Sequence, residues 1–247
     1  MDAFYENTRI VDSRDVDRFG HCRPSAFMGI LQDVAAEASV KINLSRETLM
    51  TRYGAFWMLA RIWYHLDRPL RWNEAVTVRT WHRGGQGASM YRDFDISVDG
   101  VPVGEAVSSW ILADWQTRKL LRMSQVLEFT GTTGGSLCKT KTLQKLRQPE
   151  GLTLAERRRM HYSDTDINGH VNNIKYADFV CDALHMEHLD PAQYVAELQM
   201  GYLAECRPGE EIDIFTGENQ QQQYVHGVGD EGKARFDGTV TLGRSSP

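Results

Sequence analysis

A short pattern of residues occurs twice in this chain of 247 residues, and the two copies start 149 positions apart, at Asp15 and at Asp164. The first copy reads 15-DVDRFGHCRPSAF-27 and the second reads 164-DTDINGHVNNIKY-176. Both contain D-x-D-x-[FN]-G-H, and Phe19 stands in the first copy where the second has Asn168. Repetition at a fixed spacing indicates two copies of one structural unit.

The segments that follow the two copies come in the same order. After each copy, apolar residues recur at three- and four-residue steps, as they do on one face of a helix. This stripe contains Phe27, Ile30, Leu31 and Val34 in the first half, and Val171, Ile174, Cys181 and Leu184 in the second. Four strand-like stretches follow each helix, at 56–66, 75–83, 89–98 and 101–115 and at 194–206, 210–218, 221–229 and 233–243.

Each half is therefore predicted to contain a strand, a loop, a helix and four antiparallel strands. One helix against a strongly curved antiparallel sheet is an α+β arrangement. Residues 124–156 break the pattern with GTTGGS (131–136) and a run rich in Lys, Arg and Gln, which predicts a linker. We expect an N-terminal domain over 1–123, a linker over 124–156 and a C-terminal domain over 157–247. The alternative is one mixed domain in which the motif recurs by coincidence.

Composition excludes several classes of protein. Apolar residues make up 41% of the chain and charged residues 25%, as in globular proteins, and the net charge of -5 predicts no nucleic-acid partner. No apolar run is long enough for a membrane span, and the start MDAFYENTRIVDSRD does not resemble a signal peptide. The four cysteines lack a C-x-x-C spacing, so we expect neither a metal site nor disulfides, and a cytoplasmic location.

The second copy, continued by a predicted strand that ends in Glu205-Cys206, resembles the plant and bacterial acyl-acyl-carrier-protein (acyl-ACP) thioesterases. The resemblance covers nearly the whole chain. The residues that carry it are Asp164, Asp166, Asn168, His170, Val171, Asn172, Asn173, Lys175, Tyr176, Glu205 and Cys206. It implies two tandem hot-dog domains, of which the second is catalytic. The implied reaction is hydrolysis of the thioester between a fatty acyl chain and acyl carrier protein, which ends fatty acid synthesis, with no metal or cofactor.

The residues themselves leave two mechanisms open. His170 accepts a proton from water while Glu205 or Asp166 orients its ring, or Glu205 is the general base and His170 orients the water or the thioester. Asn168 can hold the attacking water or hydrogen-bond the reacting carbonyl. The start of the helix after His170 offers backbone N–H groups to an oxyanion.

A third mechanism has Cys206 as a covalent nucleophile, although the neighbouring Glu205 carboxylate would oppose thiolate formation. Asp164 is expected to stabilise a turn, and Asn172 and Asn173 to cap the helix. We expect the first copy to be catalytically silent because Phe19 replaces Asn168 and no Glu follows at the matching strand end.

Two further sets of residues are predicted to contact the substrate. The resemblance implies that the acyl chain enters the first domain, where Phe27, Ile30, Leu31 and Met58 are candidates to line its tunnel, with Asn172 as a further substrate contact. A local concentration of basic residues in an acidic chain predicts a docking patch for acyl carrier protein. Its members are Lys139, Lys141, Lys145, Arg147, Arg157, Arg158 and Arg159.

Alternative functions are an acyl-CoA thioesterase, a non-catalytic acyl-binding module and, less in keeping with the motif spacing, a hot-dog dehydratase. Joint retention of Asp166, Asn168, His170 and Glu205 favours an enzyme over a binding module. Two fused copies can pair within one chain, so the protein is expected to be a monomer or a homodimer.

Overall fold

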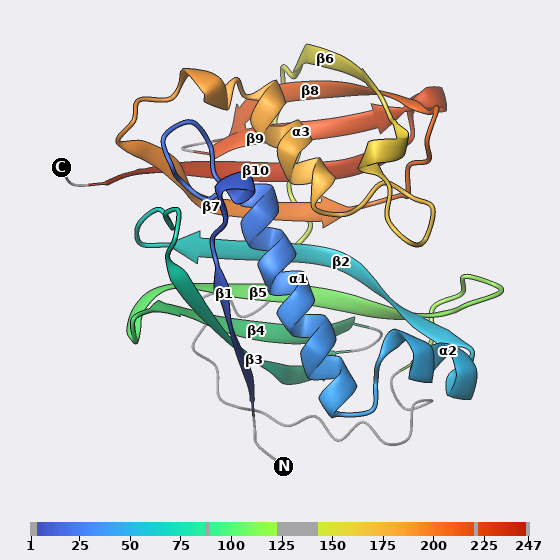
Figure 1. Cartoon of the computed structure of the whole chain (residues 1–247). Helices are drawn as coiled ribbons and strands as arrows, with labels where there is room; N and C mark the ends of the chain where they lie inside the picture. The colour runs from blue at the N-terminus through green and yellow to red at the C-terminus, as the bar shows by residue number, and fades with distance from the viewer. Residues whose placement is uncertain (1–3, 87–88, 123–142, 220–221, 246–247) are drawn as a thin grey trace.

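The computed structural model describes residues 4–86, 89–122, 143–219 and 222–245 (Figure 1). The predicted docking residues Lys139 and Lys141 lie outside these ranges. The first half contains β1 (Tyr5–Ile10), η1 (Ser13–Asp15), α1 (Pro24–Lys41), α2 (Arg46–Tyr53), β2 (Ala55–Leu66), β3 (Ala75–Gln86), β4 (Ser89–Val98) and β5 (Val101–Asp114). The second half contains β6 (Thr153–Arg159), η3 (Tyr162–Asp164), α3 (Lys175–Ala183), η4 (Met186–His188), β7 (Gln193–Tyr202), β8 (Glu211–Asn219), β9 (Gln222–Gly229), η5 (Asp230–Gly232) and β10 (Ala234–Arg244).

Three features differ from the sequence-based expectation. Helix α2 was not predicted, although Ser45 caps it and Gly54 ends it in the left-handed conformation. Strand β6 begins at Thr153, so the last part of the predicted linker belongs to the sheet of the second half. Strand β7 ends at Tyr202, because the chain then turns away, and Glu205 and Cys206 lie in the segment that follows rather than in the strand.

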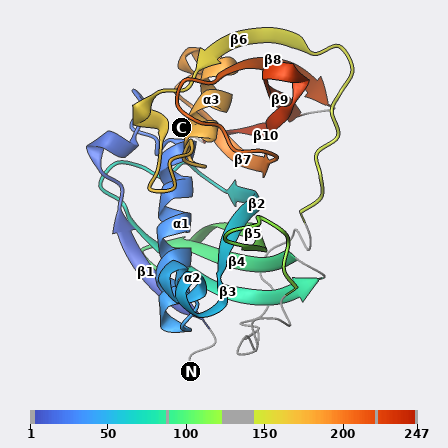
Figure 2. The same cartoon turned by 90° about the vertical axis from the view of Figure 1, so that its right-hand side faces the viewer.

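The ten described strands form one antiparallel sheet in the order β1-β3-β4-β5-β2-β7-β10-β9-β8-β6. The two halves meet at its centre, where residues 61–65 of β2 pair with residues 197–201 of β7. Helices α1 and α3 lie on the same side of the curved sheet and contact each other (Figures 1 and 2). The architecture is therefore the predicted helix-on-sheet unit, present twice and joined edge to edge.

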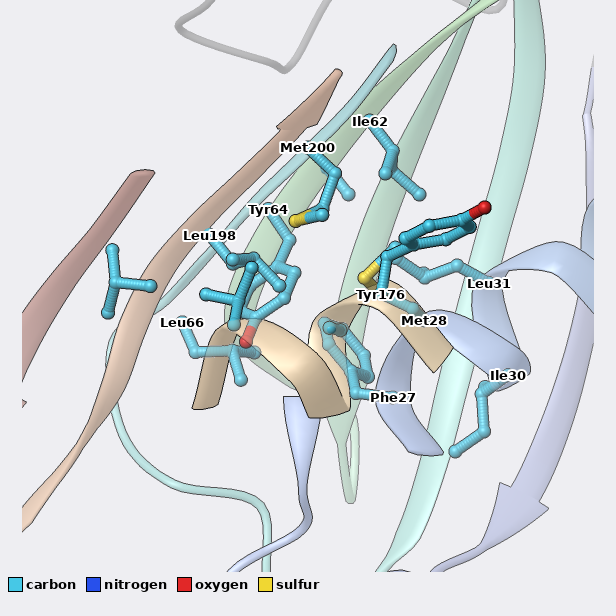
Figure 3. Packing of buried hydrophobic residues seen from close by; sticks show 14 of the residues in the cluster. Phe27, Met28, Ile30, Leu31, Ile62, Tyr64, Leu66, Tyr176, Leu198 and Met200 are labelled. Atoms are coloured by element: carbon cyan, nitrogen blue, oxygen red, sulfur yellow. The ribbon is translucent and has the colours of Figure 1, made fainter. Parts of the chain in front are cut away.

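The main hydrophobic core is shared by the two halves (Figure 3). Phe27 of α1 packs edge to face on Tyr64 of β2, with ring centroids 5.0 Å apart. Leu198 and Met200 of β7 and Tyr176 of α3 belong to the same cluster. Because buried apolar area is the main favourable contribution to folding, neither half keeps a full core without the other.

The two copies of the repeated motif fold in the same way. We refer to residues 164–172 as the motif loop and to residues 15–23 as the twin loop. Gly20 and Gly169 both have positive φ, +75° and +74°, and donate to the carbonyls of Asp17 and Asp166 at 3.1 and 3.0 Å. Positive φ explains why glycine occupies this turn position in both copies.

A second hydrogen bond is present in both copies. It joins the twin loop to the segment after β2 and the motif loop to the segment after β7. Cys22 N donates to Leu70 O at 2.7 Å, and Val171 N donates to Cys206 O at 2.9 Å. Leu70 is therefore the structural counterpart of Cys206, and Pro69 is the counterpart of Glu205. The agreement of these bonds in the two halves confirms that the chain contains the same unit twice.

Candidate active site

A cavity of about 780 Å³ lies between the two halves, and we call it the first cavity. Its mouth is formed by the motif loop and by residues 202–205 of the second half. Most of its wall comes from α1, α2 and the sheet of the first half. The large apolar side chains of that wall are Phe56, Trp57, Met58, Leu59, Met90 and Trp110.

His170 and Glu205 lie side by side at the mouth of the first cavity. His170 Nε2 lies 3.1 Å from Glu205 Oε2, and the other carboxylate oxygen lies 3.8 Å from Arg118 Nη1. The His170 side chain is 12% exposed, whereas that of Glu205 is 46% exposed. Glu205 can therefore meet both a water molecule and the imidazole.

Backbone contacts from β10 fix the segment that carries Glu205. Leu203 N and Ala204 N both donate to Arg235 O, and Arg235 Nη1 donates to Glu205 O at 2.7 Å. Together with the bond between Val171 N and Cys206 O, they place Glu205 beside the motif loop. These hydrogen bonds, and not the end of a strand, bring Glu205 next to His170, which lies 35 positions earlier in the sequence.

Both the nitrogen and the oxygen of the Asn168 carboxamide are hydrogen-bonded. Asp166 accepts from Asn168 N at 2.8 Å and from Asn168 Nδ2 at 3.3 Å, while Arg46 Nη2 donates to Asn168 Oδ1 at 3.1 Å. The arrangement sets the orientation of the carboxamide. A primary amide carries two N–H bonds, so one of them remains for a ligand in the cavity.

Cys206 lies outside the group of side chains around the first cavity. It is fully buried in the main core, and it does not line the first cavity. Burial raises the pKa of its thiol, although a side-chain hydrogen bond with Tyr176 and the nearby Arg235 oppose the rise. A buried neutral thiol is a poor nucleophile, so this placement argues against the covalent mechanism.

Asp164 and Asn172 act within the loop itself. Asp164 Oδ2 accepts from His161 N at 2.8 Å, as expected for a residue that stabilises a turn. Asn172 Oδ1 accepts from Ile174 N at 3.2 Å at the entrance to α3, and Asn172 does not line the first cavity. Helix α3 begins only at Lys175, so its first turn lies farther from His170 than the sequence predicted.

The residues predicted to line the acyl tunnel lie in different parts of the structure. Met58 lines the first cavity. Ile30 and Leu31 lie in the core between α1 and the sheet, and Phe27 lines a second cavity beside the twin loop. The tunnel role of these residues stays a prediction, because the core face of a helix and a tunnel wall have the same residue pattern.

Polar side chains also line the wall of the first cavity, and Arg92 and His82 are two of them. Arg92 is 2% exposed and donates to His82 Nε2 and to Thr80 Oγ1. Burial lowers the pKa of Arg92 to about 10, and burial together with the Arg92 charge holds the pKa of His82 well below its usual range. His82 is therefore a neutral acceptor beside a buried cation at neutral pH.

Sequence reasoning missed Arg46 and Arg118, the two first-half arginines at the mouth. Both guanidinium groups lie over the Trp115 ring, at 5.6 and 5.1 Å from its centroid, and Arg118 also lies over Phe56 at 4.7 Å. Their contacts to Asn168 and Glu205 join the halves across the site. A cap at Ser45 with Gly54 nine positions later was the available signal for α2, but no local pattern indicates a partner 122 positions away.

The predicted docking residues within the described ranges lie in two segments, the one after residue 142 and strand β6. Lys145 and Arg147 are exposed in the segment after residue 142, where Leu143 packs against Val107 and Gln144 O accepts from Gln199. Arg157, Arg158 and Arg159 lie on β6, at the end of the sheet. Arg157 pairs with Asp213 at 2.6 Å and Arg158 with Asp182 at 2.9 Å, so part of this charge is already balanced. Their docking role stays a prediction.

Neither a metal-binding cluster nor a membrane-spanning helix is present among the described residues. Within them, no three His, Cys, Asp or Glu side chains gather in a way that would hold a metal ion. Among the same residues, no helix combines the length and the apolar character needed to cross a membrane.

The fold and the site define a class: two fused units of one helix on a curved sheet, with a His/Glu/Asn cluster in the second. The acyl-ACP thioesterase N-terminal domain family model matches residues 2–128, and the acyl-ACP thioesterase C-terminal domain model matches residues 149–235. The chain therefore belongs to the acyl-ACP thioesterase family and has its α+β double hot-dog fold, as the sequence predicted.

Three similar proteins illustrate this membership. A crystal structure of an acyl-ACP thioesterase from Bacteroides thetaiotaomicron superimposes with a TM-score of 0.86 at 21% identity, over 98% of both chains. The 12:0-ACP thioesterase from Umbellularia californica superimposes with a TM-score of 0.81 at 18% identity, over 99% of both chains. The chloroplastic oleoyl-acyl carrier protein thioesterase 1 of Arabidopsis thaliana is 24% identical over 86% of this chain, which spans only 63% of the length of that relative.

Proposed function

We propose that the chain hydrolyses the thioester between a fatty acyl group and acyl carrier protein, which releases the free fatty acid. One observation carries the proposal: His170, Glu205 and Asn168 meet at the mouth of a large cavity with an apolar wall. An apolar cavity with a few converging polar groups suits a ligand that has a long hydrocarbon tail and one reactive polar centre. Family membership supports the same reaction.

In the proposed mechanism, Glu205 is the general base. It takes a proton from water while the water oxygen attacks the thioester carbon, and His170 holds the carboxylate in place. The free N–H of Asn168 Nδ2 polarises the carbonyl and stabilises the oxyanion that forms. The carbon–sulfur bond then breaks, the thiolate of the phosphopantetheine arm takes the proton from Glu205, and the fatty acid leaves.

The test is hydrolysis of acyl carrier proteins that bear chains of different length, with the released fatty acids identified. Glu205→Ala should lower kcat/KM by roughly 10²–10⁴-fold, the usual contribution of a general base. Cys206→Ala is the matched control at the next position and should keep most of the activity. The opposite ranking of the two variants would overturn the assignment of Glu205 as the base.

A parallel assay with acyl-CoA thioesters separates the two enzyme hypotheses. Both substrates present the same phosphopantetheine thioester, so the reacting groups treat them alike. A preference for the carrier-bound chain therefore has to come from contacts with the carrier protein. A lower kcat/KM with acyl carrier protein than with acyl-CoA would favour the alternative function, an acyl-CoA thioesterase.

A further inference from the structure

A second cavity of about 500 Å³ lies at the position of the twin loop. Residues 17–24 and 69–70 of the first half form one side, and α3, η4 and β7 of the second half form the other. It is the counterpart of the first cavity, because each cavity combines the loop of one half with the helix and central strand of the other. Its volume is within the usual range of small-molecule sites, about 300–1,000 Å³.

The second cavity keeps His21 at the position of His170 but lacks the other two groups assigned to hydrolysis. Phe19 stands at the position of Asn168, and the hydrogen bonds that align Leu70 with Cys206 place Pro69 at the position of Glu205. Neither side chain can activate water or polarise a carbonyl. A ligand in this cavity would be bound without being cleaved.

Most of the interior of the second cavity is apolar and deeply buried. Phe27 and Tyr64 are each 1% exposed, Leu66 is 5% exposed and Phe179 is 2% exposed. These side chains come from α1, β2 and α3, so the cavity reaches the boundary between the halves. An apolar interior of this kind favours a hydrocarbon tail.

One buried polar group in this interior has no partner. His21 is 4% exposed, and its Nδ1 atom makes no hydrogen bond to the described residues. Burial lowers the pKa of His21, so the ring is neutral at neutral pH. An unpaired buried nitrogen is costly, and a ligand with a polar head removes this cost by pairing with it.

Five described carboxylates line the second cavity, and two of them form salt bridges with cations of the same lining. Asp178 pairs with Lys175 and Asp182 pairs with Arg158, while Asp17 accepts from two backbone N–H groups. Asp164 accepts from His161 N at 2.8 Å, and Glu187 Oε1 lies 3.1 Å from His185 Nδ1 and 3.6 Å from His188 Nε2.

The remaining two cations stand on the twin loop. Arg18 lies over the Phe19 ring at 4.5 Å, and Arg23 donates to Arg14 O. Among the described residues, neither has a carboxylate partner, and both are exposed. An anionic head group on the ligand would therefore find two arginines at the entrance.

We propose that the second cavity binds a free fatty acid, with its carboxylate near Arg18, Arg23 and His21 and its tail among Phe27, Tyr64 and Leu66. This deepens the proposed function and rests on it for the identity of the ligand, since a fatty acid is the product of that reaction. The twin loop is then a binding element that keeps His21 and the cavity, without counterparts of Asn168 and Glu205.

The experiment counts dodecanoate sites per chain by isothermal titration calorimetry, below the concentration at which dodecanoate forms micelles. The wild-type chain should bind two molecules, one in each cavity. Cys181→Trp fills the second cavity from α3 and should reduce the count to one. Arg18→Gln/Arg23→Gln should weaken the second site at least about tenfold without filling it.

The matched control is Lys41→Gln/Arg207→Gln, which removes two exposed cations that line neither cavity. It should bind two molecules with wild-type affinity. A count of one for the wild-type chain, or a second site that neither twin-cavity variant changes, would overturn the proposal. Equal affinity for methyl dodecanoate would show that no carboxylate is recognised, which also contradicts it. Binding is counted without turnover, so a chain that fails to hydrolyse acyl-ACP still gives a clear result here.

Discussion

Arg46 is the residue that most closely links the two halves at the site. It comes from α2 in the first half, yet its guanidinium donates to the carboxamide oxygen of Asn168 in the second half. An asparagine amide can rotate by half a turn at little cost unless both ends are bonded. Arg46 and Asp166 therefore decide which end of Asn168 faces the substrate.

Replacement of Arg46 should affect turnover more than binding. Arg46→Ala should lower kcat about tenfold, the equivalent of one lost hydrogen bond in the transition state, and leave KM nearly unchanged. Arg46→Lys should recover part of kcat, because an ammonium group still donates. Arg52→Ala, on the same helix but outside the cavity lining, serves as the control. A rise in KM with constant kcat would contradict the positioning role.

Asp237 predicts how stability depends on pH. It is 3% exposed on β10, and burial raises its pKa to about 6 against the opposing effect of Arg61 and Lys145. Between about pH 4 and pH 6, the folded chain holds a proton that the unfolded chain has lost. The free energy of unfolding therefore falls as the pH rises through this range, and the charged form costs up to about 3 kcal/mol above it.

Asp237→Asn should remove this cost. Its melting temperature should exceed that of the wild-type chain at pH 7.5 and approach it at pH 4.5, as measured by differential scanning calorimetry. The opposite trend, a variant that gains stability only at acid pH, would show that the carboxylate is stabilised in its charged form.

Helix α2 is the element that carries the unpredicted part of the site. Ser45 Oγ accepts from Thr48 N at 3.1 Å at its start, and Gly54 ends it with a φ of +57°. Gly54 O accepts from Trp115 N at 2.7 Å, which fastens the helix to the end of β5. Eight residues are too few for a stable isolated helix, so its ends and this contact hold Arg46 at the cavity.

Two glycines should respond to alanine in opposite directions. Gly54→Ala forces a β-carbon into the left-handed region and should lower the free energy of unfolding by about 1 kcal/mol. Gly29→Ala, inside α1, meets only Ile174 at 4.0 Å and should raise it by roughly 0.5–1 kcal/mol. Urea unfolding of both variants measures the difference, and a loss of stability from Gly29→Ala would show that α1 and α3 pack too closely for a methyl group.

The sequence was most informative where an element repeats. The constant offset between the two copies aligned Gly20 with Gly169 and predicted two equal units. The twin loop and the motif loop make matching hydrogen bonds, as that alignment requires. It was least informative for side chains that meet across the halves, such as Arg46 and Asn168, because no local pattern records a distant partner. Ile30 and Leu31 show a different limit, since an apolar helix face reads the same whether it packs in a core or lines a tunnel.

At the scale of the molecule, the two halves behave as one folding unit. The pairing of β2 with β7 makes the sheet continuous, and α1 packs against α3 above a common core. Each cavity also needs both halves for its walls. Stability and activity are therefore properties of the joined pair.

Cutting the chain between the halves should leave the pair intact. A protease site inserted at 131–136, outside the described residues, allows the purified protein to be cleaved after folding. The two fragments should elute together in size-exclusion chromatography and keep most of the hydrolysis, because the sheet and the core hold them. Separation into two folded fragments would contradict a shared core.

The division of the first cavity between the halves has a consequence for inheritance. Its apolar wall is encoded mostly within codons 32–118, while the motif loop and Glu205 are encoded within codons 164–205. A recombination event between these stretches exchanges the wall together with Arg46 and Arg118, and leaves Asn168, His170 and Glu205 in place. Selection can therefore change the accepted hydrocarbon chain independently of the hydrolytic residues only where the incoming wall keeps these two arginines.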